Sequence, residues 1–271
     1  MTWYTIDMII LLPVFVFLLG LIIGSFLNVV ILRINTGRSI TTGRSKCAHC
    51  SRVLKWYELV PVFSYLALGG KCRTCKATIS RQYALVELVT GITFVVIYMM
   101  TLVKGGFTLF SLISFVFVCV IASLLMVLTI YDLKHKIIPN QIVYTFIVLS
   151  FLSILWKTLY VPGFMPGETI AAGFILTAPF FLLWYFSKGK FMGFGDVKLM
   201  LGIGWLLGIS VGTMALLFSF WIGGIVGMFL LALTHRYSMK SQVPFAPFLV
   251  AGTFIAGIWG ITISNFFNLW Q

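Results

Sequence analysis

The sequence predicts an all-α membrane protein with about eight transmembrane helices and a small cytoplasmic zinc-binding loop after the first helix. Three observations predict this class: an apolar composition, long runs without charge, and basic residues gathered in alternate loops. Of the 271 residues, 61% are hydrophobic and 9% are charged, whereas soluble domains carry about 25% charged residues. The mean hydropathy is +1.09. We therefore expect most side chains to face lipid or one another.

The apolar runs place the helices in order, because a helix needs about 20 apolar residues to span a membrane. The uncharged stretch 199–233 is too long for one span and short for two, so we expect a turn at 208–212 inside it. The chain would then comprise a first helix at 1–32, a polar loop domain at 33–82 and a helical membrane domain at 83–271. The expected spans are 8–32, 83–103, 107–131, 141–160, 169–187, two within 199–233, and 247–267.

The basic residues orient these helices. Seventeen of the 19 Lys and Arg residues fall in four loops on one side, and only Lys104 and Lys157 fall on the other. Loops rich in Lys and Arg face the cytoplasm, so we expect a multi-pass protein of the inner membrane with both termini outside the cytoplasm. The same signal accounts for the net charge of +13, and membrane lipid rather than nucleic acid is the expected partner. The four basic loops are 33–82, 132–140, 188–198 and 235–246.

Four cysteines in the first cytoplasmic loop form two CxxC pairs separated by 21 residues. Two such pairs can present four thiolates tetrahedrally, as structural zinc prefers. Cytosolic thiols stay reduced, so two disulfides are the weaker interpretation; the same thiols could also form a redox dithiol or stay unligated. A metal would supply folding free energy to a loop too small to bury a core. The predicted ligands are Cys47, Cys50, Cys72 and Cys75.

Two of the six acidic residues, Asp132 and Asp196, flank short cytoplasmic turns at matched depth. Either one alone could be a helix cap or a residue reaching the interface. Gly193 and Gly195 precede Asp196 and would let backbone or substrate approach closely. Two neighbouring, partly desolvated carboxylates share a proton, so that one acts as base and one as acid at a single water. The pair therefore predicts aspartic proteolysis.

These residues fall within motifs that cover nearly the whole chain, and the chain resembles the bacterial type IV prepilin peptidases, membrane enzymes of the GxGD aspartic peptidase class. A lone GxGD would be weak, but the ordered set is specific. The motifs are GSFLNVVI (24–31), the tetracysteine loop, WYELVPVFSY (56–65), GKCR (70–73), ISRQYALVE (79–87), the segment 132–140, and GFGDVKL (193–199).

The resemblance implies that Asp132 and Asp196 are the catalytic pair, supported by Gly193 and Gly195 in the GxGD motif. It makes residues 83–271 the aspartic peptidase domain. The implied substrates are type IV prepilins or pseudopilins, which carry a short basic leader ending in Gly before an apolar helix. Cleavage is expected at the cytoplasmic face of the membrane.

Many members also methylate the new N-terminal amine with S-adenosylmethionine, an activity associated with the N-terminal loop. Glu58 matches a position of the family's loop motif and is the candidate for this role; an ion pair with a basic neighbour is the competing interpretation. Leu59 and Asn35 depart from the family pattern, so methylation is implied less strongly than cleavage. Glu87 lies within a predicted span, where an acid is functional or paired, for instance with Arg81.

Two further classes of function compete with a peptidase. A proton- or cation-coupled transporter could use the same two aspartates, but they lie at one membrane face rather than the midplane, and no inverted repeat is visible. A zinc-stabilised interaction scaffold without chemistry is the third hypothesis. Substitution of either aspartate separates the peptidase from the transporter and from the scaffold.

Overall fold

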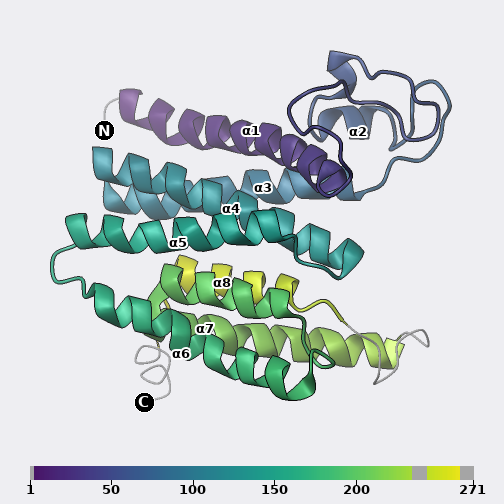
Figure 1. The fold of residues 1–271 in the computed structure, drawn as a ribbon. Coiled ribbons are helices and arrows are strands. Elements are labelled where there is room, and N and C mark those ends of the chain that lie inside the picture. Colours follow the sequence, from purple (N-terminus) through teal and green to yellow (C-terminus); the bar gives the residue numbers. More distant parts are fainter. Residues whose placement is uncertain (1–2, 234–242, 263–271) are drawn as a thin grey trace. The chain divides into compact units, whose positions relative to one another are not determined.

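The computed structural model describes residues 3–233 and 243–262, and every regular element in them is a helix apart from two isolated β-bridges (Figure 1). The predicted all-α class is therefore confirmed for the described chain. The chain forms two compact units, residues 1–127 and 128–271.

The first unit is built on two helices, α1 (Trp3–Arg33) and α3 (Gln82–Tyr98), which pack against each other. The helix α3 continues into η2 (Met99–Val103), a π-helical turn. A Cβ atom at Gly20 would lie 2.7 Å from the Cα of Gly91, and one at Gly24 would lie 2.7 Å from the Cα of Glu87. The two backbones thus touch through small residues, as is typical of helix pairs in membranes.

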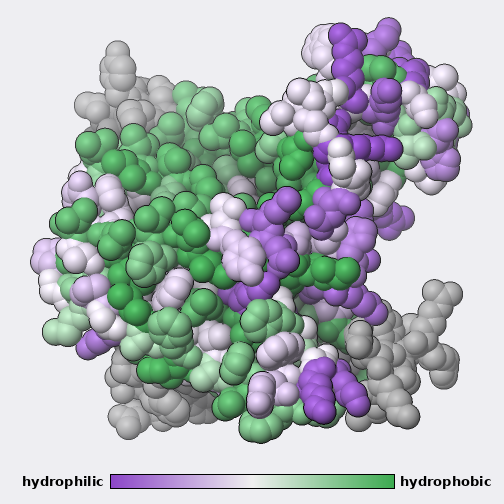
Figure 2. Space-filling model, in the orientation of Figure 1, coloured by the Kyte–Doolittle hydropathy of each residue, from purple (hydrophilic) through white to green (hydrophobic). Residues whose placement is uncertain are grey.

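A long loop joins α1 to α3 and holds only two short helices, η1 (Trp56–Glu58) and α2 (Phe63–Ala67), neither of which contains a buried residue. Hydrophilic side chains gather over this loop in Figure 2, whereas the surface over the helices is mainly apolar. Within the loop, the apolar side chains of Phe63 and Leu66 are 60% and 68% exposed. Exposed apolar groups on a polar segment are typical of a contact with the membrane interface.

The second unit contains the end of α4 (Leu109–His135) and four further helices. In this unit α7 contacts three others, α5, α6 and α8. A Cβ atom at Gly204 of α7 would lie 2.7 Å from the Cα of Gly173 of α6, so these two helices also meet backbone to backbone. The four helices are α5 (Asn140–Tyr160), α6 (Pro166–Ser187), α7 (Phe194–Leu233) and α8 (Ala246–Trp259).

Six of the described helices are long and apolar enough to cross a membrane. The 40-residue α7 breaks at Gly208, whose φ of 76° and ψ of −178° are not helical, in the region where the sequence predicts a turn. With the two parts of α7 and the shorter α8 counted separately, the described chain has eight apolar helical segments of ten residues or more. The last part of the predicted span 247–267 lies outside the described residues. Arg236 and Lys240 of the last basic loop also lie outside them.

A lysine from a neighbouring helix supports the break in α7. The ammonium of Lys157 in α5 donates a hydrogen bond of 2.7 Å to the carbonyl oxygen of Leu206. Carbonyl groups in the last turn before a break lose their intrahelical donors. Lys157 therefore supplies a donor where the backbone of α7 needs one.

Replacing Lys157 by Met is expected to lower the free energy of unfolding by about 1–3 kcal/mol, because the Leu206 carbonyl loses its donor in apolar surroundings. Denaturant unfolding of the purified protein in detergent would measure the loss. Thr158→Val is the matched control, since the Thr158 hydroxyl bonds only to the carbonyl of Ile154 in its own helix. Equal effects of the two substitutions would rule out this role for Lys157.

Candidate functional site

The second unit brings together the two aspartates singled out in the sequence. Asp132 lies near the C-terminal end of α4 and is 5% exposed. Asp196 lies in the first turn of α7 and is partly exposed. The negative charge of Asp132 acts electrostatically on the Asp196 carboxyl group. Two acidic residues that are 64 positions apart in the sequence are therefore near enough in space to influence each other electrostatically.

A third helix end contributes to this site. The carboxylate Oδ2 of Asp132 accepts a hydrogen bond of 3.3 Å from the backbone N–H of Ala246, the first residue of α8. The first N–H groups of a helix lack intrahelical partners and favour a negative charge nearby. Sequence reasoning missed Ala246, because a backbone donor 114 residues away has no side-chain signature. Pro247 indicates only that a helix starts there.

The two glycines of the GxGD motif have different surroundings. A Cβ atom at Gly195 would lie 2.8 Å from the Cβ of Ile138, so a side chain there would collide with the segment that precedes α5. A Cβ at Gly193 would meet nothing closer than 3.9 Å, and one of those nearest atoms is Oδ2 of Asp196. The N–H of Asp196 donates to the Gly193 carbonyl at 3.3 Å. The motif thus forms a tight turn into α7 that packs against the chain following Asp132.

Lys198 joins the two segments that carry the aspartates. Its ammonium donates a hydrogen bond of 2.8 Å to Oδ1 of Asn140, the first residue of α5. The same ammonium lies 4.6 Å from the ring centre of Tyr144 and 5.1 Å from that of Phe194, within the range of cation–π attraction. The Lys198 side chain therefore connects the start of α7 to the start of α5. The sequence alone does not indicate this contact.

The four loop cysteines lie in two turns of the same construction. In each turn the N–H of the first cysteine bonds to the carbonyl five residues later, and its carbonyl accepts the N–H four residues later. Bridges between residues 46 and 53 and between 71 and 78 close the two turns. Ser51 and Lys76, which follow the second cysteine of each pair, both have positive φ angles, 54° and 58°. Equal backbone geometry presents both pairs of thiols in the same way.

The four sulfur atoms all lie within 4.8 Å of one another, and those of Cys47 and Cys75 are 3.9 Å apart. Four sulfurs bound about 2.3 Å from a central zinc ion would be about 3.8 Å apart. All four cysteines are free thiols, and backbone N–H groups of Cys75 and Thr74 lower the pKa of the Cys72 thiol to about 6. The cluster can therefore hold a metal ion with four sulfur ligands.

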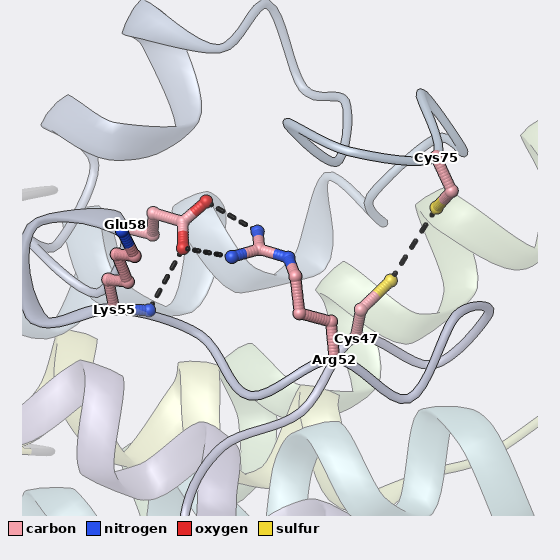
Figure 3. Close-up of polar contacts among 5 residues, drawn as sticks. All are labelled: Cys47, Arg52, Lys55, Glu58 and Cys75. Carbon is pink, nitrogen blue, oxygen red and sulfur yellow. Dashed lines mark hydrogen bonds and ion pairs between the residues drawn. The ribbon is translucent and has the colours of Figure 1, made fainter.

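Glu58 lies in the same loop and forms an ion pair (Figure 3). Its carboxylate accepts two hydrogen bonds from the Arg52 guanidinium, at 2.7 and 3.1 Å, and one from the Lys55 N–H at 2.9 Å. Arg52 and then Lys55 hold the pKa of Glu58 below its usual value. Both oxygens are engaged, so the ion pair that competed with a role in methyl transfer is present. The role of Glu58 in methyl transfer stays a prediction.

Comparisons with known proteins identify two family regions in the chain. Residues 18–101 match the bacterial peptidase A24 N-terminal domain, and residues 119–228 match the type IV leader peptidase family. No solved structure matches the chain.

Curated relatives match along nearly the full length. A prepilin leader peptidase/N-methyltransferase of Aeromonas salmonicida is 32% identical over 93% of this chain and 92% of its own. The protein of that name in Bacillus subtilis is 33% identical over 93% of this chain and 96% of its own. The one in Pseudomonas aeruginosa is 28% identical, over 92% and 90%.

Proposed function

This chain belongs to the type IV leader peptidase family, and we propose that it removes the leader from type IV prepilins or pseudopilins at the cytoplasmic face of the membrane. The six long apolar helices found among its described residues, together with its family, make it a multi-pass protein of the inner membrane. The observation that carries the proposal is that one compact unit holds Asp132 of α4 and Asp196 of α7 near enough to influence each other electrostatically. The relatives give no support to a transporter using the same aspartates.

In the proposed reaction the two carboxyl groups share one proton. The ionised carboxylate removes a proton from water as the water oxygen attacks the carbonyl carbon of the scissile peptide bond. The protonated group donates to the carbonyl oxygen, and a proton then passes to the leaving amine as the carbon–nitrogen bond breaks. Ala246 and Lys198 position the aspartates, and Gly195 lets the turn before Asp196 pack closely against Ile138. This peptidase chemistry belongs to the domain at 83–271.

We propose that Cys47, Cys50, Cys72 and Cys75 hold a structural zinc ion, which would stabilise the loop domain at 33–82 after the first helix at 1–32. The cluster of free thiols supports this. The names of the relatives also support methylation of the mature N-terminus with S-adenosylmethionine. In that activity Glu58 stays the loop candidate, and its ion pair with Arg52 would act by fixing the shape of the loop.

Co-expression with a prepilin, followed by mass spectrometry of the mature pilin, tests both activities. We expect a new N-terminus directly after the leader glycine, and a mass increased by one methyl group if methylation also occurs. An uncut prepilin in the presence of the folded, membrane-inserted protein would contradict the peptidase function. Cut but unmethylated pilin would contradict the methyltransferase function alone.

Replacing Lys198 by Met is expected to lower the kcat of cleavage about ten- to a hundredfold with little change in KM. A hydrogen bond from a charged donor contributes about 1.5–3 kcal/mol. Its loss would weaken the contact between the starts of α7 and α5. Because Lys198 is not expected to contact the substrate, KM should change little. Lys190→Met is the control, because Lys190 is an exposed cation of the same basic turn. A raised KM with an unchanged kcat would show instead that Lys198 binds substrate.

A further inference from the structure

The carboxylate of Glu87 is buried in the first unit without a cation beside it. Glu87 lies in the apolar helix α3 and is 7% exposed. Arg81, the partner considered from the sequence, is exposed. Among the described side chains, those of residues 11–233 and 243–262, the only ion pair is the one between Arg52 and Glu58. An acidic side chain at such a position normally has a cationic partner or a function.

The groups that do contact this carboxylate are neutral. Its Oε2 accepts a hydrogen bond of 2.7 Å from the backbone N–H of Val62, and the Ser25 hydroxyl on α1 is a neutral donor close to the carboxylate. An ionised carboxylate has about four acceptor positions. With only two neutral donors, the Glu87 carboxylate keeps unused acceptor positions, and no positive charge balances its negative charge.

A second unmatched acceptor lies one helical turn away. Asn28 is 2% exposed, and its Nδ2 donates to the carbonyl of Tyr83 at 3.1 Å, but its Oδ1 has no partner. Asn28 follows Ser25 by one turn on α1, and Tyr83 precedes Glu87 by one turn on α3. The amide oxygen and the carboxylate thus lie on the same α1–α3 contact. Most buried acceptors in folded proteins have a donor, from the protein, from water or from a ligand, so the Asn28 oxygen has room for one.

We propose that Glu87 and Asn28 form a binding site for a primary alkylammonium group. An ammonium brings a positive charge and three N–H donors, which match one carboxylate and one amide oxygen better than water or a neutral donor does. Methyl transfer offers this group twice, as the α-ammonium of S-adenosylmethionine and as the N-terminal ammonium of the cut pilin. In this respect the inference rests on the proposed methyltransferase activity, and it places that activity beside α1 and α3.

The backbone that covers Glu87 is strained. Val62 has a φ of 59° and a ψ of −50°, a conformation that a β-branched side chain disfavours. Its N–H is held by the Glu87 carboxylate. A ligand ammonium that replaced this N–H would keep Oε2 of Glu87 hydrogen-bonded.

Binding measurements on the full-length protein in detergent test the site by isothermal titration calorimetry. The probes are S-adenosylmethionine and a peptide with the apolar mature N-terminus of a pilin, prepared with a free or an acetylated amine. Glu87→Gln keeps an acceptor for Val62 but removes the charge, and Asn28→Leu removes the free amide oxygen. Thr90→Val is the control, because the hydroxyl of this buried residue bonds only to the Val86 carbonyl of its own helix.

We expect Glu87→Gln and Asn28→Leu each to weaken binding of one probe about tenfold or more, while Thr90→Val binds as the parent does. Loss of S-adenosylmethionine binding would assign the site to the methyl donor. Loss confined to the free-amine peptide would assign it to the pilin amine. A parent that binds neither probe, or variants that bind both as the parent does, would overturn the proposal. Prepilin cleavage by the same variants reports on the peptidase separately.

Discussion

Replacing Asp132 or Asp196 by Asn is expected to abolish prepilin cleavage while the protein still folds and inserts. Asn keeps the size of Asp, and at position 132 it can still accept the Ala246 N–H, but it cannot take a proton from water or share one with its partner. General acid–base catalysis contributes about 10²–10⁴-fold to rates, and either substitution removes both halves of a shared-proton pair. We therefore expect cleavage to fall at least about a hundredfold, below detection on a gel of co-expressed prepilin.

Glu168→Gln is the matched control for these substitutions. Glu168 is also an acid at a helix end, in the first turn of α6, but it is exposed and belongs to a different loop. Its loss should leave processing unchanged. Full cleavage by either aspartate variant would reject the two-aspartate mechanism, whatever the family assignment.

Removal of zinc is expected to unfold the loop domain at 33–82. Structural zinc contributes about 10–16 kcal/mol of apparent binding free energy in small domains, and neither short helix of this loop contains a buried residue. We expect about one zinc ion per chain in the parent and far less in Cys72→Ser. Limited proteolysis after chelation should then cut the loop while α1 and α3 stay protected.

Cys119→Ser controls for the loss of a thiol, because Cys119 is buried in α4 and lies outside the cluster. It should keep the zinc and the protease resistance of the loop. A metal-free preparation with an equally resistant loop would show that the four thiols need no metal.

Features set by local sequence are predictable here. The length of each apolar run predicts a span, and a 35-residue run that suits neither one nor two ordinary spans predicts the break found at Gly208. The CxxC spacing predicts the sulfur cluster, because each pair is made within one short turn. The two aspartates are noticeable because acids are rare in this chain and both flank short turns.

Features that depend on pairs distant in the sequence could not be predicted in this way. The Ala246 N–H that binds Asp132 belongs to the backbone, so no residue type marks it. Lys198 looked like one more cytoplasmic cation, although its ammonium bonds to Asn140, 58 residues away. Asn28 stood in a recognised motif, but only the packing of α1 on α3 shows that its amide oxygen lacks a donor.

The central claim is that two carboxyl groups of one chain act together on one water, and co-expression of two inactive chains tests it most directly. Cells producing both Asp132→Asn and Asp196→Asn chains contain every required carboxyl group, but never both in the same chain. We expect their prepilin to stay uncut, while a parent chain produced beside either variant cuts it normally. Cleavage restored by the mixture of the two variants would contradict the claim.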